Sequence, residues 1–490
     1  MNKVLHFFEE ISKIPRGSYR EQAISDYFMA FAKSRGLKAI QDKALNVVIY
    51  KPGSPGHENK APLLLQSHMD MVWEKNANTV HNFETDPIKL RKEGDFIYAT
   101  GTTLGADNGV GVALSLALLD SSDIAHPPLE VLFTSEEEVT MKGIGELDAG
   151  LLSARRMINF DSGDDSSFCV GCAGGGRLEF NVPVEREPLP AGSVCLILTV
   201  RGLQGGHSGL EIDCGRANSI RVLGRALNAL KKEAKIVSVS GGLKANAIPR
   251  EADAVVAIPA AEVGRAEQIL SALQQTLRKE YRIPDPDITL ALSPITESNK
   301  ANKANKANQS NKANHANKVF TVDSARRVIS ALLLIPYGVL HMSADIPDLV
   351  ETSNNMGVLE TRENTIYMDC ALRSSVPSRR EFIKDQILAL AVALDGTVDF
   401  AHGYPAWTYD PDSPLLAVAT RLFKEMYNKD PGIEAVHAGL ECGYMMEKIP
   451  DMDIISYCSN VYDYHTPNEH MSVSSLEKVW KYTLELLKRL

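Results

Sequence analysis

The first third of the chain alternates short apolar runs with helical stretches, and this alternation constrains the fold more than any other feature of the 490 residues. The runs are bounded by polar or glycine-containing segments, which is typical of buried strands. They lie at 46–50, 62–65, 129–133 and 157–160. Residues 110–119 are apolar on nearly every side and predict a helix packed into the core. Strands and helices alternating in this way predict an α/β sheet domain.

Two serine–glutamate pairs match the capping box, in which a serine at a helix start and a glutamate three residues later each bind a free backbone N–H. The first pair is Ser18 with Glu21, ahead of a helical pattern that ends near Gly36. The second pair is Ser474 with Glu477, ahead of the last helical pattern of the chain. The sequence therefore predicts helices capped by these two serines.

The pattern changes near residue 187. Strand-like runs at 194–200, 254–258 and 365–372 then mix with amphipathic helical patterns at 217–232 and 262–279, which is typical of an α+β unit. Short strands and a final helix return toward the end of the chain. We therefore expect a first domain in two parts, 1–186 and 399–490, with a second domain, 187–398, inserted into it.

Residues 299–318 repeat Asn-Lys-Ala with little variation. Such a segment has no apolar face to pack, so it predicts a low-complexity surface loop within the second domain. A cationic tether for an acidic partner is the weaker interpretation.

Composition excludes several classes of partner. A formal net charge of −10 gives no reason to expect nucleic acid or an anionic membrane, which favour a basic face, and a small ligand is more plausible. No apolar run reaches the roughly 18 residues of a membrane-spanning helix, and the N-terminal stretch lacks the unbroken apolar core of a signal peptide. Seven scattered cysteines fit a reducing compartment, so we expect a cytoplasmic protein.

Histidine and carboxylate side chains recur directly after the predicted strands of the first domain. They are His68 and Asp70, Asp107 after the glycine turn 101–105, Glu136 to Glu138, and Asp161. In an open parallel sheet the carboxyl ends of the strands meet at one crevice, so these groups are expected to face one pocket.

Several carboxylates in one pocket repel each other unless a cation neutralises them, so the pattern implies a metal. Imidazole and carboxylate without thiolate suit Zn, Co or Mn, and carboxylates in excess of one tetrahedral shell suit two ions. Each motif alone is weak, because three glutamates are more often a solvated face. Their joint placement favours the metal site. On a strand His68 and Asp70 point the same way, so Asp70 could orient His68.

Eight segments carry a resemblance to a known family. They are SHMDMV (67–72), GTTLGADNGVGVA (101–113), FTSEEEVTMKG (133–143), NFDSGD (159–164), GGHSG (205–209), NAIPRE (246–251), HAGLECG (437–443) and HTPNE (465–469). Together they resemble the di-zinc exopeptidases that include peptidase T, aminoacylase and carnosinase, and the Xaa-His dipeptidases among them most of all. The resemblance covers nearly the whole chain apart from the Asn-Lys-Ala repeat. It implies a catalytic domain with a mostly parallel central sheet and an inserted α+β lid and dimerisation domain.

The resemblance also implies roles for single residues of the first domain. The terminal metal ligands would be His68, Glu138, Asp161 and His465. Asp107 would be the bridging carboxylate, Asp70 the residue that orients His68, and Glu137 the general base. Three adjacent glutamates leave the register of base and ligand open by one residue.

In the second domain the resemblance implies that His207 faces the developing oxyanion and that Asn246 and Arg373 lie near the substrate carboxylate. An imidazole donor suits the first task, and a guanidinium suits the second. Gly439 would line the pocket. Without the family, a lone histidine in a glycine-rich loop is more often a turn residue. The lid would also mediate a homodimer.

The expected function is metal-dependent hydrolysis of dipeptides, of the Xaa-His type or of wider range, by a water that two ions activate and Glu137 deprotonates. One alternative is an N-acyl amino acid amidohydrolase, because the same chemistry cleaves both bonds. A dipeptidase must satisfy a free α-ammonium, whereas a deacylase needs an apolar acyl slot. The other alternative is an inactive metal-binding scaffold, which would have lost the base or a ligand, and this sequence retains them all.

Overall fold

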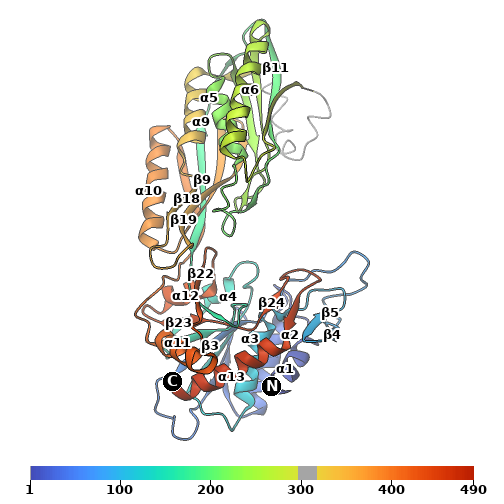
Figure 1. The fold of residues 1–490 in the computed structure, drawn as a ribbon, viewed down its shortest axis with the longest axis vertical. Coiled ribbons are helices and arrows are strands. Elements are labelled where there is room, and N and C mark those ends of the chain that lie inside the picture. Colours follow the sequence, from blue (N-terminus) through green and yellow to red (C-terminus); the bar gives the residue numbers. More distant parts are fainter. Residues whose placement is uncertain (1, 296–316) are drawn as a thin grey trace. The chain divides into compact units, whose positions relative to one another are not determined.

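The computed structural model describes residues 2–295 and 317–490, and the chain forms two compact units (Figure 1). Unit 1 comprises Met1–Cys172, Trp407–Ala435 and Leu440–Leu490, and unit 2 comprises Ala173–Ala406 and Val436–Gly439. The repeat predicted as a loop at 299–318 falls outside the described residues except for its last two.

Unit 1 is built on an eight-stranded sheet of order β1-β2-β6-β3-β7-β23-β8-β22. The strands are β1 (Lys38–Gln41), β2 (Val47–Lys51), β3 (Leu63–His68), β6 (Leu129–Thr134), β7 (Arg156–Asn159), β8 (Ser167–Cys172), β22 (Gly432–Val436) and β23 (Asp453–Ser456). The four central strands β6, β3, β7 and β23 are parallel, and β1, β2 and β8 pair antiparallel beside them. The parallel centre means that β6, β3 and β7 end at the same edge.

The central strands are where the apolar runs predicted them. Every residue of β3 and of β6 is buried, as expected for strands covered on both faces. Helix α3 (Ala106–Asp120) is buried on nearly all sides and packs against β3, while α1 (Asn2–Ile11) packs against α3. The predicted core helix at 110–119 is therefore confirmed.

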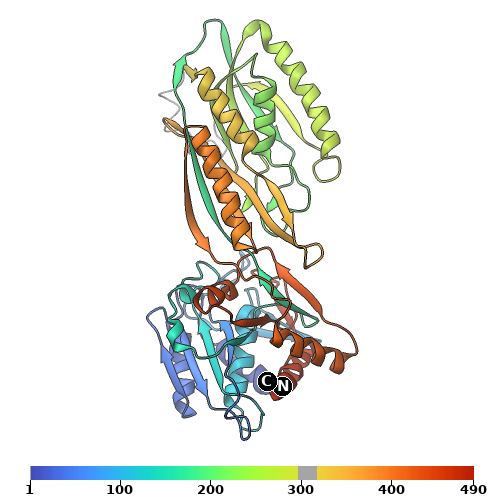
Figure 2. The ribbon, with the colours of Figure 1, turned by 90° about the vertical axis from the view of Figure 1, so that its left-hand side faces the viewer.

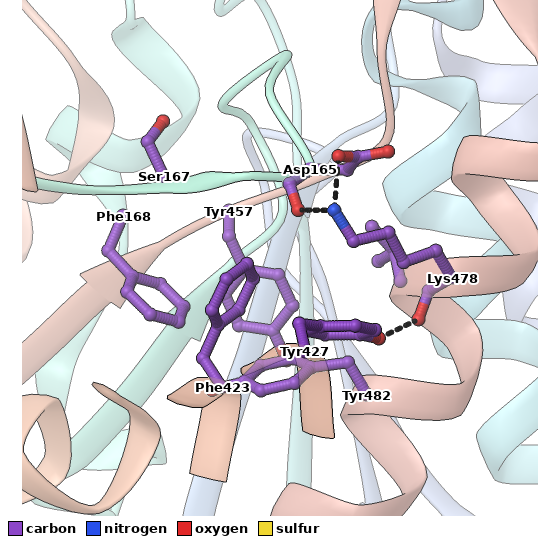
Figure 3. A pocket seen from close by; sticks show the side chains of 9 residues that line it. Asp165, Ser167, Phe168, Phe423, Tyr427, Tyr457, Lys478 and Tyr482 are labelled. Carbon is purple, nitrogen blue, oxygen red and sulfur yellow. Dashed lines mark hydrogen bonds and ion pairs between the residues drawn. The ribbon is translucent and has the colours of Figure 1, made fainter. Parts of the chain in front are cut away.

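The remaining helices of unit 1 are α2 (Gln22–Ser34), α4 (Lys142–Glu146), α11 (Pro414–Tyr427), α12 (Glu441–Lys448) and α13 (Val473–Arg489). Aromatic side chains fill the space between α11, α13 and the sheet and enclose a small cavity (Figure 3). There Phe168 contacts Phe423, Tyr457 and Tyr482, and Lys478 binds the Asp165 carboxylate at 2.6 Å. This region is apolar core and holds none of the predicted site residues.

Both predicted capping boxes are wrong. Ser18 does not cap α2 but donates to the Asp70 carboxylate at 2.8 Å, and Glu21 accepts from the backbone N–H of Tyr19 and of Glu136. At the last helix the cap is Ser472, which accepts from the N–H of Ser475. At α2, distant partners bind the side chains of Ser18 and Glu21. At the last helix, Ser472 rather than Ser474 caps the first turn.

Unit 2 is built on a nine-stranded sheet of order β16-β11-β15-β13-β19-β20-β9-β21, with β18 paired to β19. The strands are β9 (Gly174–Pro183), β11 (Ser193–Arg201), β13 (Lys235–Gly241), β15 (Ala252–Pro259), β16 (Thr289–Pro294), β18 (Gly338–Met342), β19 (Val350–Thr361), β20 (Thr365–Ser374) and β21 (Thr397–Tyr404). All the pairings described in this sheet are antiparallel. The runs at 194–200, 254–258 and 365–372 are confirmed as strands β11, β15 and β20.

Four helices of unit 2 contact one another in the order α10, α9, α5, α6 and form a layer against the sheet (Figure 2). They are α5 (Ser219–Ala229), α6 (Val263–Glu280), α9 (Val322–Leu334) and α10 (Pro377–Ala393). The sheet and this layer share one apolar core, which gives the α+β architecture that the pattern predicted. Among the described residues, none of the helices combines the length and apolarity that crossing a membrane requires.

Candidate metal centre

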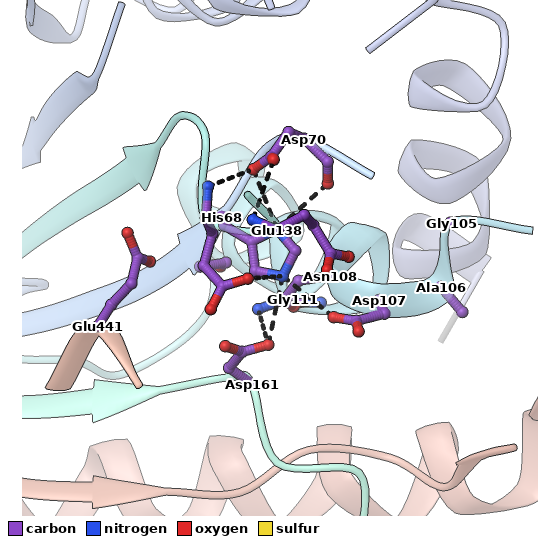
Figure 4. Close-up of polar contacts among 12 residues, drawn as sticks. His68, Asp70, Gly105, Ala106, Asp107, Asn108, Gly111, Glu138, Asp161 and Glu441 are labelled. Atoms are coloured by element: carbon purple, nitrogen blue, oxygen red, sulfur yellow. Dashed lines mark hydrogen bonds and ion pairs between the residues drawn. The ribbon is translucent and has the colours of Figure 1, made fainter. Parts of the chain in front are cut away.

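The histidine and carboxylate clusters of unit 1 meet at the edge where the parallel strands end (Figure 4). His68 is the last residue of β3, Glu137 and Glu138 follow β6, and Asp161 follows β7. Asp107 lies in the first turn of α3. His465 comes from a loop between two short strands, β24 (Val461–Tyr462) and β25 (His470–Ser472). Segments far apart in the sequence therefore supply one cluster.

Asp107 lies between the two imidazoles of this cluster. Its Oδ1 is 3.0 Å from Nε2 of His68, and its Oδ2 is 3.3 Å from Nε2 of His465. Each oxygen of one carboxylate thus faces a different histidine, which is the arrangement that a bridging ligand needs.

The other two carboxylates divide between the histidines. Asp161 Oδ1 is 3.4 Å from Nε2 of His68, while Glu138 Oε2 is 3.0 Å from Nε2 of His465. The side chains therefore form two sets, each with one imidazole and one terminal carboxylate, and Asp107 belongs to both.

Asp70 orients His68 and the segment that follows β6. The Nδ1 atom of His68 is 3.2 Å from the Asp70 carbonyl oxygen and 3.4 Å from its carboxylate Oδ1, so a proton on Nδ1 leaves Nε2 directed at Asp107. The same carboxylate accepts the backbone N–H of Glu137 at 3.1 Å and of Glu138 at 3.3 Å. One buried carboxylate thus fixes the imidazole of His68 and the backbone of Glu137 and Glu138.

The electrostatics of the cluster favour a cation at both Nε2 atoms. Asp107 and Glu138 raise the pKa of His465 to about 10. Burial lowers the pKa of His68, but Asp161 and Asp107 outweigh it and hold that pKa well above its usual range. Burial raises the pKa of Asp161 to about 6. Burial opposes the ionisation of Asp107 as well, yet the two histidines lower its pKa.

These residues fit a pair of divalent ions. The donor set is imidazole and carboxylate, which suits Zn, Co and Mn, and the ligand atoms of His68, Asp107 and Glu138 all lie within 4.8 Å of one another. Glu138 Oε1 is buried without a hydrogen-bond partner among the described residues. A bound cation would satisfy that oxygen and would replace the protons that the histidines otherwise hold.

Glu137 lies at the edge of this cluster. Its Oε2 is 3.9 Å from Nε2 of His68. Burial raises the pKa of Glu137 well above its usual range, against the attraction of His68 and with a contribution from Glu441. A carboxylate with a raised pKa can accept and return a proton near neutral pH. Glu136 lies apart, with its carboxylate bound to the hydroxyl of Thr140 at 3.0 Å.

A second group of predicted residues meets within unit 2. His207 is the last residue of β12 (Gly206–His207), and its Nδ1 accepts the backbone N–H of Gly209 at 3.2 Å and of Leu210 at 3.1 Å. The proton of the neutral ring is therefore on Nε2. Burial and the Arg373 guanidinium lower the pKa of His207, which keeps the ring neutral.

Arg373 and Gly439 lie near His207. A Cβ placed on Gly209 would be 3.2 Å from Cε1 of His207 and 3.3 Å from Cζ of Arg373, so both side chains border this glycine. Arg373 donates to the Tyr404 hydroxyl at 2.7 Å, and the Tyr404 ring borders Gly439. The predicted residue Asn246 is exposed and accepts the N–H of Ser208 through its carbonyl oxygen at 2.9 Å.

Three residues around these groups were missed by sequence reasoning. Tyr404 stands in no motif and gave no signal. Glu469 is the last residue of the HTPNE segment, four residues after the motif histidine, and its position there was the available signal. Arg16 lies two residues before Ser18, outside every motif, yet its side chain is fully buried beside the candidate metal centre.

Comparison with known proteins identifies the class of this chain. The model of peptidase family M20/M25/M40 matches residues 64–489, which is most of the sequence. The chain belongs to this family, and the predicted metallopeptidase class is confirmed at that level.

Comparison with individual proteins shows which members of this family the chain resembles. The chain is 34% identical over 485 residues to the cytosol non-specific dipeptidase of Escherichia coli (strain K12), covering 99% of this chain and 96% of that protein. It is similar to the crystal structure of aminoacylhistidine dipeptidase from Vibrio alginolyticus, with a TM-score of 0.90 and 35% identity over 100% of this chain and 96% of that one. Aminopeptidase PepT from Bacillus cereus ATCC 10987 shares the fold, with a TM-score of 0.55 and 14% identity over 99% of this chain and 98% of that one. The predicted fold class and the resemblance to Xaa-His dipeptidases are confirmed.

Proposed function

We propose that this chain is a cytoplasmic dipeptidase that uses two divalent ions, most simply zinc, to hydrolyse dipeptides of the Xaa-His type and others of similar size. The observation that carries this proposal is Asp107, whose two oxygens face two separate histidine and carboxylate sets. A single-ion site would need only one of these sets. Co or Mn would suit the same donors.

In this mechanism Glu137 is the general base. When bound, two ions would polarise the scissile carbonyl and lower the pKa of the attacking water. Glu137 accepts the proton of that water and delivers it to the leaving amine, a task for which its raised pKa is suited. Asp70 keeps the proton of His68 on Nδ1, and His68, Asp161, Glu138 and His465 would hold the ions.

Unit 2 is proposed to be the lid that binds the substrate. The Nε2–H of His207 would donate to the oxyanion, because the two N–H groups that bind Nδ1 leave the proton on Nε2. Arg373, held by Tyr404, would bind the substrate carboxylate with Asn246, and Gly439 would line this subsite. A guanidinium offers the two parallel donors that a carboxylate accepts.

His207→Ala is expected to lower kcat by roughly 10²–10³ and to change KM little, because an oxyanion contact acts mainly in the transition state. Steady-state kinetics on one dipeptide measure both constants. His341→Ala, an exposed histidine of the same unit, is the control and should match the wild type. An unchanged kcat in His207→Ala would exclude the catalytic role.

A dipeptide panel tests the proposed activity against the amidohydrolase alternative. One relative is named as non-specific and the other by its aminoacyl-histidine substrates, so breadth has to be measured. The panel should contain β-alanyl-histidine, other Xaa-His and Xaa-Xaa dipeptides, and N-acetylated amino acids, each with and without added Zn, Co and Mn. Preference for free-amino dipeptides supports the proposal. Preference for N-acetyl substrates would replace it by the amidohydrolase.

A homodimer through unit 2 is part of the proposal. Helix α10 buries Ile383 and Ile387 but exposes Phe382, Leu388 and Val392, with Val392 70% exposed. Exposed apolar side chains gathered on one helix are typical of an association surface. Sedimentation equilibrium should give twice the mass of one chain, and a monomer at micromolar concentration would contradict the proposed homodimer.

The cytoplasmic location is supported by seven free cysteines and by the name of the Escherichia coli relative.

A further inference from the structure

A buried arginine joins two of the segments that carry the metal-centre residues. Arg16 is 2% exposed and donates from Nη1 to the carbonyl oxygens of Met69 at 3.1 Å and Asp70 at 3.2 Å. Its Nη2 donates to the carbonyl oxygen of Gly105 at 2.5 Å. The first two carbonyls directly follow His68, and the third lies two residues before Asp107. One planar guanidinium thus connects the end of β3 to the start of α3.

A buried glutamate binds the same turn from a third segment. Glu469 is 2% exposed, and its Oε2 accepts the backbone N–H of Leu104 at 2.8 Å and of Gly105 at 3.0 Å. Its Oε1 accepts those of Ala106 at 2.7 Å and Asp107 at 3.2 Å. Glu469 lies four residues after His465. The carboxylate therefore connects the turn that bears one candidate ligand to the loop that bears another.

Gly105 is where the two contacts meet. Its N–H binds Glu469 and its carbonyl oxygen binds Arg16, so the backbone just before Asp107 is held from both sides. Gly105 has φ +68°, and a Cβ there would lie 2.6 Å from Nη2 of Arg16. This close approach requires glycine.

The charges of the two side chains are complementary. Burial lowers the pKa of Arg16 to about 10, opposed by Glu469, Asp70 and Asp107, so the guanidinium stays protonated at neutral pH. Among the described residues, neither side chain forms a hydrogen bond or an ion pair with the imidazole or carboxylate atoms that face the proposed ions. Apart from electrostatic attraction or repulsion through space, the two side chains act on those atoms through the backbone that they hold.

We propose that Arg16 and Glu469 are positioning residues of the metal centre, which together hold the backbones that carry His68, Asp107 and His465 at the spacing that two ions need. This inference rests on the proposed two-ion function. It is independent of the roles of Glu137 and of unit 2. Ligand atoms have to be held to within about 0.5 Å for tight coordination, and residues behind the ligands provide that precision.

The experiment uses Glu469→Gln and Arg16→Lys in the full chain. The first replaces one carboxylate oxygen by an NH₂ group that cannot accept two N–H bonds. The second keeps the charge but cannot reach three carbonyl oxygens. Zinc affinity is measured by competition with a chromogenic chelator, zinc stoichiometry by elemental analysis, and kcat and KM on one dipeptide. Substitution of a residue that holds metal ligands in position typically weakens metal binding 10–100-fold, and we expect such a loss in both variants.

Two controls match the chemistry away from the centre. Glu130 is a buried carboxylate that accepts the N–H groups of Ser153 and Ala154 at the other end of β6. Arg221 in unit 2 donates from one nitrogen to the carbonyl oxygens of Leu332, Leu333 and Ile335. Glu130→Gln and Arg221→Lys should lower Tm but leave zinc affinity within twofold of the wild type. They separate positioning from general stability.

The kinetic signature of positioning is a lower kcat that recovers as zinc is raised, with KM within twofold. Zinc affinity within twofold of the wild type in Glu469→Gln and Arg16→Lys, or an equal loss in the controls, would overturn the inference. If Glu469→Gln does not fold, Arg16→Lys decides alone. A wild-type protein that binds no zinc, cobalt or manganese would instead remove the proposed function, and this inference with it.

Discussion

Removal of divalent ions from the purified protein is expected to abolish dipeptide hydrolysis and to lower Tm. The carboxylates of Asp107, Asp161 and Glu138 crowd around His68 and His465 at 3.0–3.4 Å, and the ions would offset the mutual repulsion of these carboxylates. Each ion at about a hundred times its Kd contributes roughly 2.7 kcal/mol, which corresponds to about 5–10 °C per ion in a unit of this size. Dialysis against a chelator, followed by calorimetry and an activity assay, measures both effects.

Re-addition of single metals is the control for this prediction. Zn, Co or Mn should restore activity and Tm, with saturation at two ions per chain, whereas Mg should restore little because it prefers oxygen ligands to imidazole. Full hydrolysis by a preparation shown to be free of metal contradicts the two-ion mechanism. Saturation at one ion per chain would retain a metal site but remove the bridging role of Asp107.

The sheet and the clustering of most residues of the candidate metal centre could be predicted from the sequence because their signals are local. A buried parallel strand appears in the sequence as a short, mainly apolar run, and β3 and β6 both begin with such a run. The residue after such a strand lies at the carboxyl edge of the sheet, so strand order alone brings His68, Glu138 and Asp161 to one place. His465 follows no long apolar run, and only the family motif pointed to it.

The residues that support the site could not be predicted, because their partners are distant in the sequence. Ser18 and Glu21 satisfied a local capping rule, yet Asp70 and the N–H of Glu136 are the partners they bind. Arg16 and Glu469 bind backbone atoms, which carry no residue-specific signal. The hydrogen bond from Arg373 to the Tyr404 hydroxyl depends on β9, which pairs with β20 on one side and with β21 on the other.

Substitution of Glu137 is expected to have the largest effect of any single change. Glu137→Gln keeps the size of the side chain but cannot accept a proton, so kcat should fall by roughly 10²–10⁴. Both ions should remain bound, because Glu137 Oε2 is 3.9 Å from Nε2 of His68, farther than the carboxylates of Asp107, Asp161 and Glu138 are from the two imidazoles. Metal analysis and kinetics on the same preparation measure the two outcomes together.

The neighbouring glutamates are the controls, because each has a different environment within three consecutive residues. Glu138→Gln removes the charged oxygen that faces His465 at 3.0 Å, so one ion should be lost and raised metal should restore part of the activity. Glu136 binds Thr140 and should tolerate Gln with a modest change in kcat. The opposite result would be metal loss in Glu137→Gln and, in Glu138→Gln, full metal binding with a strongly reduced kcat. It would show that Glu138 is the base and Glu137 the ligand.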